Sequence, residues 1–474
     1  MTLAAIYQPA KIKDWLLLGA VSLLVGFAFY KVDSLPILFI VLAAFILGIL
    51  SITRNLKYGF YLLLYSSFFS VGLTRYLPGL PLGLLNDFLL VIMFLVMFFQ
   101  KFKDISWKPL HNAIFLVVAG WMVLNIMEIV NPESRSIEAW FYAMRGVSLY
   151  FFLTVLMGMM YLNHDRDFHW FIKIWFVCSI IGSLWGLKQL YIGLDEFEKA
   201  WLSVPGNLST HVLFGKLRVF SFYSDAGQFG ASQAHTSLVA GLLATKEKRT
   251  GRKLFYLFTF VMCLLGMLIS GTRGAIAIPV IGIFSYFLLI RNWRIVIVGG
   301  IIAIGIFVVL KYTSIGQGIY QINRLRTALN PNDASFQVRL DNQARLAKYL
   351  NSHPFGGGIG SAGYWGQRFS PNTFLANLAL DSWYVRIAAE FGYFGLFIYL
   401  GIVITILVRS ALNILRVMDE AKRNQLIAIF SGLSGIMVAS YTNQVFGQMP
   451  TGILIYISIV FLAKALTDEK ATTA

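Results

Sequence analysis

The sequence has few cysteines and few charged residues. Only two of its 474 residues are cysteine, Cys178 and Cys263, and both stand within apolar runs. A cysteine in such a run behaves as a small buried hydrophobe, so we expect neither a disulfide framework nor a cysteine-based metal site. Charged residues make up 13% of the chain and hydrophobic residues 58%. Because water-soluble domains carry about 25% charged residues, this composition excludes that class and indicates a polytopic membrane protein.

Acidic residues are scarcer than basic ones, 22 against 39, which gives a net charge of +17. An excess of this kind is typical of nucleic-acid-binding proteins when it forms a continuous stripe. Here the Lys and Arg residues are scattered in small groups at the ends of apolar runs and in two loops. We therefore expect no nucleic-acid partner. The expected partners are the lipid bilayer, with its anionic headgroups, and phosphates carried on lipids.

Apolar runs long enough to span a membrane, about 17 to 25 residues, recur along the chain. They predict an all-α polytopic fold of about 12 to 14 transmembrane helices. No small-residue cleavage site follows the first run, so we expect a retained span and not a signal peptide. The candidate spans are 15–30, 35–52, 57–74, 82–99, 111–130, 138–161, 169–191, 227–244, 253–270, 273–290, 294–310, 381–408, 424–442 and 449–466.

Positive charge gathers in every second short loop, as the positive-inside rule requires if the N-terminus is cytoplasmic. This orientation predicts that both termini are cytoplasmic and that segments 192–226 and 311–380 share the outer face. The second segment is a large outer loop that we expect to be partly helical. The predicted parts are an N-terminal transmembrane bundle (1–200), a central transmembrane segment with the first outer loop (201–310), the large loop (311–380) and C-terminal transmembrane helices (381–474).

The first outer loop leads into a span that is unusually polar for its depth. A polar group that faces lipid costs several kcal/mol, so the polar face of this span points into the bundle. It either makes interhelical hydrogen bonds or forms the wall of a polar cavity open to the outer face. For His235, packing within the bundle and contact with a substrate remain alternatives. The polar residues are Arg218, Ser221, Ser224, Asp225, Gln228, Ser232, Gln233 and His235.

The turn SGTRGA, residues 270–275, holds a charged residue at a predicted membrane boundary. Arg273 stands there between Gly271 and Gly274. An arginine in this place either extends to lipid headgroups or binds phosphate oxygens in a bidentate manner.

The large loop contains one predicted helix, through Ser335 to Leu350, capped by a preceding Asn or Asp. Apolar residues at intervals of three and four predict that its buried face carries Leu340, Ala344, Ala347 and Leu350, with Phe336 one turn earlier. Arg339 on this helix is either a solvated charge or a substrate contact.

The run FGGGIGSAG follows this helix, at residues 355–363. It is not a phosphate-binding P-loop, because the GK[ST] element is absent. We expect Gly358 and Gly360 to let the backbone approach a substrate or the helical bundle closely.

Asp381 stands at the first turn of the next span, where the helix dipole stabilises a carboxylate. It is either a helix cap or part of a site. Arg386 and Glu390, four residues apart further along this span, are expected to pair inside the bundle.

These motifs, taken in order, resemble the O-antigen ligase and O-antigen polymerase superfamily over roughly residues 200 to 440. They are an Arg-x-x-Ser segment before a polar span, an S-x-T-R-G turn, a Pro-x-Gly-x-Gly stretch late in a large loop, and a polar pair followed after nine residues by G-x-x-G. The matching residues are Arg218 and Ser221, Ser270 to Gly274, Pro354 to Gly360, and Asp381, Ser382, Gly392 and Gly395.

The resemblance implies a glycosyltransferase of the C type at the outer face of the bacterial inner membrane. Such an enzyme transfers glycan from a polyprenyl diphosphate carrier to an acceptor hydroxyl, without a metal or another cofactor. In the ligases, the general base is a histidine at the position of Asp381. The departure favours an O-antigen or exopolysaccharide polymerase, whose acceptor is glycan, over a ligase that uses lipid A-core. A chain-length regulator is a further candidate partner.

The expected chemistry assigns roles to the candidate residues. Cleavage releases a lipid diphosphate, whose growing charge needs fixed cations, and Arg218 and Arg273 are the best placed, with Arg339 third. Asp381 is the expected base for the acceptor hydroxyl. Two alternatives stay open: a protein O-oligosaccharyltransferase, and a lipid-linked sugar transporter, in which a repeat between halves is expected. The further candidates for substrate binding are Ser221, Asp225, His235, Gly358, Gly360 and Ser382.

Overall fold

A computed structural model gives the fold in two compact units, residues 1–59 and 60–474. In the first unit, residues 46–54 are helical. All the candidate site residues belong to the second unit. The structure describes residues 46–78, 80, 82–101, 107–204, 206–213, 215–290, 334–380 and 382–466, together with 300, 305, 308–309, 311–314 and 326.

The described part of the chain is helical apart from one small hairpin. Strand β1 (Val212–Leu213) pairs antiparallel with β2 (Lys216–Leu217). Short 3₁₀ turns are η2 (Leu82–Leu84), η4 (Lys108–Leu110), η5 (Glu128–Val130) and η7 (Arg273–Ile276), and η6 (Arg145–Leu149) is a π-helical turn between α6 and α7. The α-helices are α3 (Lys57–Leu73), α4 (Leu85–Lys101), α5 (Ala113–Met127), α6 (Ile137–Met144), α7 (Tyr150–Tyr161), α8 (His164–Tyr191), α9 (Glu196–Leu202), α10 (Asn207–His211), α11 (Ala226–Lys246), α12 (Thr250–Ile269), α13 (Ala277–Ile290), α16 (Ala334–Leu350), α17 (Gly363–Phe369), α18 (Trp383–Arg416), α19 (Glu420–Ala439) and α20 (Thr451–Ala463).

Seven helical stretches within the described residues are long and apolar enough to cross a membrane. Each coincides with a span predicted from the sequence, which confirms an all-α architecture consistent with a polytopic membrane protein. Four further predicted spans are helices that are shorter or more polar, namely α3, α11, α19 and α20. The predicted spans 15–30, 35–52 and 294–310 lie wholly or largely outside the described residues. The seven stretches are Leu82–Phe99, Ala113–Val130, Ile137–Tyr161, Arg166–Tyr191, Thr250–Ile269, Arg273–Ile290 and Trp383–Arg416.

Helix α11 is buried along most of its length and packs against α8, α12, α13 and α19. Two of its polar residues, Gln233 and Thr236, make hydrogen bonds to α8. The indole of Trp175 donates to Thr236 Oγ1 at 2.8 Å, and Gln233 accepts from Ser183 Oγ at 3.0 Å and donates to the Tyr223 hydroxyl at 3.2 Å. For these residues, interhelical hydrogen bonding is thus the correct alternative.

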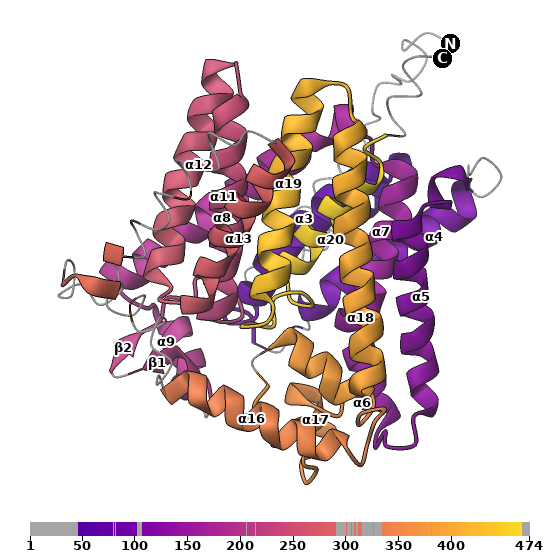
Figure 1. The fold of residues 1–474 in the computed structure, drawn as a ribbon, viewed down its shortest axis with the longest axis vertical. Coiled ribbons are helices and arrows are strands. Elements are labelled where there is room, and N and C mark those ends of the chain that lie inside the picture. The colour runs from indigo at the N-terminus through magenta and orange to yellow at the C-terminus, as the bar shows by residue number, and fades with distance from the viewer. Residues whose placement is uncertain are drawn as a thin grey trace, which may run out of the picture. The chain divides into compact units, whose positions relative to one another are not determined.

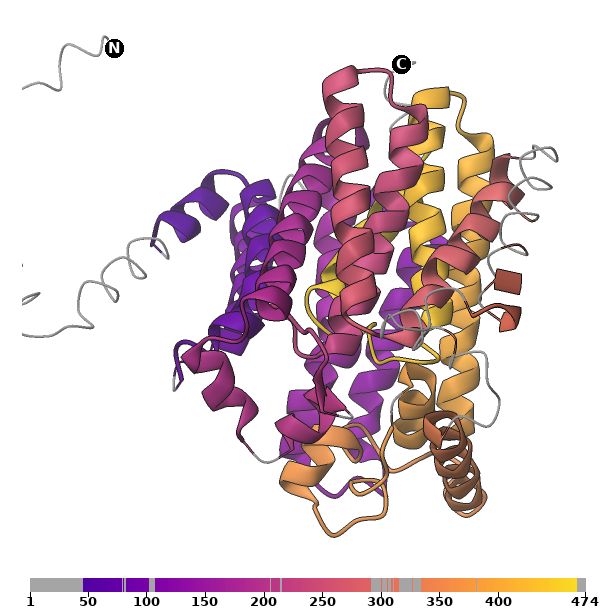
Figure 2. The same cartoon turned by 90° about the vertical axis from the view of Figure 1, so that its left-hand side faces the viewer.

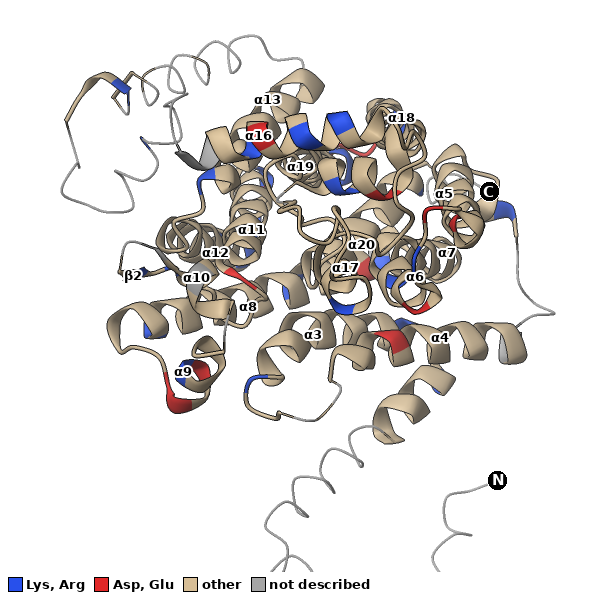
Figure 3. Ribbon diagram, turned by 90° about the horizontal axis from the view of Figure 1, so that it is seen from below, with Lys and Arg blue, Asp and Glu red and all other residues tan. Residues whose placement is uncertain are grey.

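The connections gather at two ends of the helices. The long helices run side by side, with α6, α9, the β-hairpin, α16 and α17 at one end and the α11–α12 and α18–α19 connections at the other (Figures 1 and 2). We call the first of these the loop end. Seen from there, Lys and Arg positions follow α16 more densely than Asp and Glu positions do (Figure 3). The described parts of the two segments that the sequence predicts to share one face, within 192–226 and 334–380, therefore lie at the same end of the helices.

The helix predicted in the large loop is confirmed as α16, and its predicted buried face is right at Leu350 but wrong at Leu340, Ala344 and Ala347. Leu340 is 40% exposed and Ala344 and Ala347 are also exposed. Leu350 is buried as predicted, and the second buried leucine is Leu346; both pack with apolar residues of α18 and of segment 375–380. This face turns inward because two polar residues of α16 also point that way: Asn342 Nδ2 donates to Ala379 O at 3.1 Å, and Gln343 Nε2 donates to the Tyr441 hydroxyl at 3.2 Å.

Ser382 caps the start of helix α18, and the helix breaks at Gly392. The Ser382 hydroxyl accepts a hydrogen bond from Val385 N at 3.4 Å, which satisfies one of the amides exposed at a helix start. Gly392 has φ +70° and ψ −169°, a backbone conformation that residues other than glycine rarely adopt. The break opens α18 two residues after Glu390, where the large loop docks.

Candidate active site

The connection between α19 and α20, residues 440–450, contacts several other elements at the loop end. At the start of α18, Trp383 N donates to Ser440 O at 2.9 Å. On the opposite side, near the start of α11, Ser224 Oγ donates to Gln448 Oε1 at 3.3 Å. Together with the Tyr441 contact to α16, these bonds make the 440–450 connection the common support of α11, α16 and α18.

The SGTRGA turn packs between α11 and this connection. Thr272 Oγ1 donates to Ala226 O at 2.7 Å, which ties the turn to the start of α11. On the other side, a Cβ atom on Gly274 would lie 2.3 Å from Thr442 Oγ1 and 2.7 Å from Asn443 Nδ2. Since no side chain fits there, Gly274 allows the close approach and fixes the position of the neighbouring Arg273 backbone.

The structure brings two of the predicted cations to this turn. Arg218 Nη2 donates to Thr272 Oγ1 at 3.4 Å, and Arg218 Nη1 donates to Thr210 O at 3.3 Å. Arg218 therefore contacts the residue that directly precedes Arg273, although 54 positions separate Arg218 from Thr272 in the sequence. This juxtaposition concentrates positive charge at the loop end of α11.

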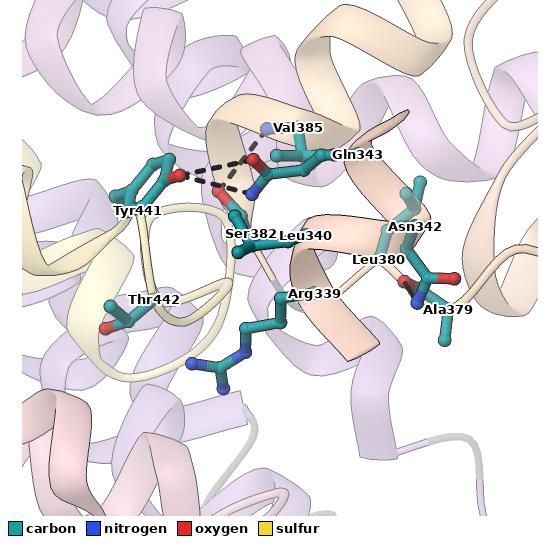
Figure 4. A pocket seen from close by; sticks show the side chains of 10 residues that line it. All are labelled: Arg339, Leu340, Asn342, Gln343, Ala379, Leu380, Ser382, Val385, Tyr441 and Thr442. Carbon is teal, nitrogen blue, oxygen red and sulfur yellow. Dashed lines mark hydrogen bonds between the residues drawn. The ribbon is translucent and has the colours of Figure 1, made fainter. Parts of the chain in front are cut away.

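Arg339, the third predicted cation, lines a small cavity on the other side of Thr442. The cavity lies between α16, the start of α18 and the 440–450 connection, and Ser382 forms part of its wall. Figure 4 shows the Arg339 guanidinium extending away from Asn342 and Ala379. Thr442 thus links the two groups of residues, because it touches Gly274 on one side and lines the Arg339 cavity on the other.

Asp381, the predicted base, lies outside the described residues. Its neighbours in sequence are both at this cavity, since Leu380 and Ser382 line it. Gln444 Nε2 donates to the carbonyl of Leu380, and Gln444 Oε1 accepts from Arg386 Nη1 at 3.4 Å. The backbone before α18 is therefore held by an amide side chain of the 440–450 connection.

The predicted Arg386–Glu390 pair is confirmed, with Arg386 Nε 3.2 Å from Glu390 Oε1. Glu390 is fully buried and also accepts a hydrogen bond from Gly360 N at 3.2 Å. The backbone amide of Gly358 donates to Glu390 O at 2.9 Å. This carboxylate therefore joins the large loop to α18.

Gly358 and Gly360 approach the helical bundle, one of the two alternatives expected for them. Both have φ +81°. A Cβ atom on Gly360 would lie 2.5 Å from Ala139 O in α6, and one on Gly358 would lie 2.9 Å from Ser134 Cβ. The structure places them against the bundle and does not bring them to Arg218 and Arg273.

Ser221 and Asp225 hold the first loop in place. Ser221 is buried with φ +52°, and its hydroxyl donates to Gly182 O at 2.7 Å. Asp225 caps α11, because its Oδ1 accepts from Gln228 N at 2.9 Å, and its Oδ2 accepts from Ser224 Oγ at 2.9 Å. The Asp225 carboxylate is only half-buried and stands at the start of the helix to which the Arg273 turn is tied.

His235 lies well inside the bundle, away from the arginines. It is fully buried in α11, with its ring 4.8 Å from the ring of Trp175. A Cβ atom on Gly432 of α19 would lie 2.6 Å from His235 Nε2. Of the two alternatives for His235, the structure matches packing within the bundle.

Sequence reasoning missed one cation. Arg75, just after α3, donates from Nη1 to Ser221 O at 2.6 Å and from Nη2 to Tyr223 O. Its guanidinium lies 4.3 Å from the centre of the Trp201 ring. Burial lowers the pKa of Arg75 to about 10, and the group is held by the carbonyls of the loop that carries Arg218.

Sequence reasoning also missed the 440–450 connection. Its signal is present in the sequence, where SYTNQ and GQ interrupt two apolar runs at residues 440–448. Such a polar segment between two spans marks either an exposed loop or a site. Among the described residues, no group of three or more His, Cys, Asp or Glu side chains is arranged to hold a metal ion.

The sequence of this region matches a known protein family. Residues 258–400 match the family model described as O-antigen ligase. The resemblance to the O-antigen ligase and polymerase superfamily is confirmed. The family match supports a membrane enzyme of the ligase or polymerase type, and it runs from within α12 through the Arg273 turn and α16 into α18. It covers less than a third of the chain and leaves out Arg218 and the 440–450 connection. No curated protein matches the chain.

Proposed function

We propose that the protein is a membrane glycosyltransferase that polymerises glycan from a polyprenyl diphosphate carrier, at the periplasmic face of a bacterial inner membrane. The observation that carries the proposal is the hydrogen bond from Arg218 to Thr272, the residue that precedes Arg273. Thr272 and Arg273 both lie within the part of the chain that matches the O-antigen ligase family model. Two guanidinium groups at one site suit a diphosphate, because each offers paired N–H donors to phosphate oxygens.

The arginines stabilise the leaving group. When the acceptor hydroxyl attacks the anomeric carbon, the bond from that carbon to the diphosphate oxygen breaks, and the electron pair leaves with the diphosphate. Fixed cations that meet this growing charge lower the barrier more than flexible ones do, since they need no reorganisation. Arg218 and Arg273 bind the diphosphate in this scheme, and Arg339 meets it from the far side of Thr442.

The base in this scheme is Asp381, which takes the proton of the acceptor hydroxyl as the new bond forms. A base in position contributes about 10²- to 10⁴-fold to the rate. Support comes from the two neighbouring residues, Leu380 and Ser382, which line the cavity that holds Arg339. We assign substrate binding to Asp225, at the start of the helix to which the Arg273 turn is tied, and to Ser382, which lines the Arg339 cavity; no cofactor takes part in this scheme.

The acceptor separates the proposal from its alternatives. A polymerase adds glycan to glycan, a ligase adds it to lipid A-core, and a protein O-oligosaccharyltransferase adds it to a protein. A lipid-linked sugar transporter makes no bond. The aspartate at the position of the ligase histidine favours the polymerase. Gel analysis of surface glycan after gene deletion separates the first two: loss of the ladder indicates a polymerase, and retained carrier-linked chains without lipid A attachment indicate a ligase.

The test is transfer by purified protein from a synthetic polyprenyl diphosphate oligosaccharide, with and without acceptor. We expect Arg273→Ala to lower the rate at least 10²-fold, the usual cost of removing one fixed donor. Arg273→Lys should recover only part of the rate, because lysine lacks the planar pair of donors. The matched control is Arg249→Ala, an exposed arginine at the opposite end of α12, and it should transfer normally. Normal transfer by Arg273→Ala would remove the assignment.

A further inference from the structure

A second, larger cavity lies at the loop end, below the C-terminal end of α16. Its volume is about 610 Å³. Residues from three segments line it: the α5–α6 connection, the end of α16 with the glycine run, and segment 369–375. We call it the aromatic cavity. Its lining includes Glu133, Arg135, Tyr349, His353, Ser361 and Phe374.

A column of stacked rings forms one wall of the aromatic cavity. The rings of Tyr349 and His353 are parallel within 3° and 4.2 Å apart, and those of Tyr349 and Phe374 are 5.2 Å apart at 23°. Phe374, at the end of the column, is 36% exposed. A flat aromatic wall of this kind offers contact area with little loss of conformational freedom, and aromatic rings of binding sites commonly carry such contacts.

Polar groups of both signs face the rings. Glu133 Oε2 lies 3.8 Å from His353 Nε2, and Arg135 lines the same space. Ser361 has a buried hydroxyl that makes no hydrogen bond within the described structure. Buried hydroxyls are nearly always hydrogen-bonded, so a ligand with hydroxyl groups would complete this one.

The mixture of rings and polar groups selects one ligand class. A carboxylate opposes the binding of phosphate, which excludes a lipid headgroup as the favoured ligand. Sugars fit better, because their hydroxyls both donate to Glu133 and accept from Arg135, while the apolar face of a sugar ring packs on an aromatic ring. Pyranose units therefore match both walls of the aromatic cavity.

The position of the aromatic cavity relative to Arg339 indicates what the cavity does. Arg339 and Tyr349 stand on the same helix, about 15 Å apart along its axis at about 1.5 Å a residue. One end of α16 lies over the candidate active site and the other over the aromatic cavity. We propose that the aromatic cavity binds sugar units of the glycan at a distance from the reacting end and holds the chain during transfer. This inference rests on the proposed function, which supplies the glycan.

The test measures binding without transfer. The probe is lipid-free oligosaccharide of several repeat units, released by mild acid from the surface polysaccharide of the cell that makes the protein. Saturation-transfer NMR with the full chain in lipid nanodiscs should show contact with sugar-ring protons. Phe374→Ala should weaken binding about tenfold, or 1.4 kcal/mol, and Phe374→Tyr should restore it. Glu133→Ala should also weaken binding, through the lost hydroxyl contacts.

Two controls fix the interpretation. Tyr364→Ala removes a ring that is 66% exposed and outside the cavity, and it should bind as the unchanged protein does. Arg273→Ala should bind the lipid-free glycan normally, so a failure of the transfer assay alone counts against the proposed function and not against the cavity. Absence of binding by the unchanged protein, equal binding by Phe374→Ala, or displacement of the glycan by short-chain phosphatidylglycerol would overturn the inference.

Discussion

The two connections at the loop end, residues 192–225 and 334–382, are held by different forces. The first is fixed by charged and amide side chains. Lys188 Nζ lies 3.0 Å from Asp195 Oδ2 and 2.9 Å from Glu198 Oε2, and Gln189 Oε1 accepts from Ser221 N at 2.8 Å. The second relies more on shape, through glycine backbone packed on α18 and through stacked rings, and its polar supports are the buried Glu390 carboxylate and the Gln444 amide.

The difference matches what each connection carries. Hydrogen bonds and ion pairs are directional, so the first connection holds the backbone on both sides of Arg218 in one geometry, as a fixed cation needs. Close backbone packing fixes the second connection at the glycine run and leaves its two ends to line cavities. The comparison teaches that the loop end combines a part fixed by charge and hydrogen bonds with a part whose ends line two cavities, and under the proposed function the second part is the one that meets the glycan.

The largest effect is expected from filling the glycine contact in the second connection. A Cβ atom on Gly392 would lie 1.8 Å from Pro354 O, and its φ of +70° disfavours alanine as well. We expect Gly392→Ala to cost about 3 kcal/mol or more and to displace segment 354–380 from α18. Limited proteolysis of the purified protein should then cut within that segment, and transfer activity should be lost.

The matched control for this variant is in the same helix. A Cβ atom on Gly401 meets nothing within 4 Å, so Gly401→Ala should leave both the proteolysis pattern and activity unchanged. If Gly392→Ala resists protease as the unchanged protein does, the second connection is not held by this packing.

A smaller effect is expected from breaking the charged anchor of the first connection. Glu198 is 1% exposed, so Lys188→Met leaves a buried carboxylate without its cation, at a cost of about 3 kcal/mol. Lys199→Met removes an exposed pair with Glu196 and should cost about 0.5 kcal/mol or less. The apparent midpoints of thermal unfolding in detergent measure the difference. Equal midpoints for the two variants would show that the first connection does not depend on its buried charges.

The smallest effect is a pH dependence of the same anchor. Burial raises the pKa of Asp195, but hydrogen bonds from Glu198 N, Tyr76 and Lys188 outweigh it and lower the pKa to about 2. Because the folded pKa lies below the unfolded value of about 3.9, this stabilisation is present above that value and is lost as the pH falls through about 2. The midpoint difference between the unchanged protein and Asp195→Asn should therefore shrink from pH 5 to pH 2. A difference that stays constant over this range would contradict the assignment.

The sequence predicts the helices well because apolar length dominates them. All seven apolar stretches fall on predicted spans, and α16 lies where its spacing places it. Motif order also identifies the Arg273 turn and the glycine run. Of the candidate site, the sequence predicts that Arg218 and Arg273 share one face, and the structure shows Arg218 in contact with Thr272, the residue that precedes Arg273.

The rest depends on contacts between distant parts of the chain. The buried face of α16 depends on two distant partners, because Asn342 donates to the carbonyl of Ala379 and Gln343 donates to the hydroxyl of Tyr441. From the sequence alone, Arg75 is an ordinary charged residue of a loop. Its contact with the carbonyl of Ser221 is visible only in the folded structure. The aromatic cavity joins residues 133 and 374, a distance in sequence that local patterns cannot bridge.

The 440–450 connection also sets an order of events during biosynthesis. It leaves the ribosome after every arginine of the candidate site, yet it supports the start of α18 and packs against the Arg273 turn. A nascent chain that ends before residue 440 carries the cations without the framework that aligns them. The contacts of the α19–α20 connection are therefore the last to form, and they complete the packing around the Arg273 turn and the start of α18.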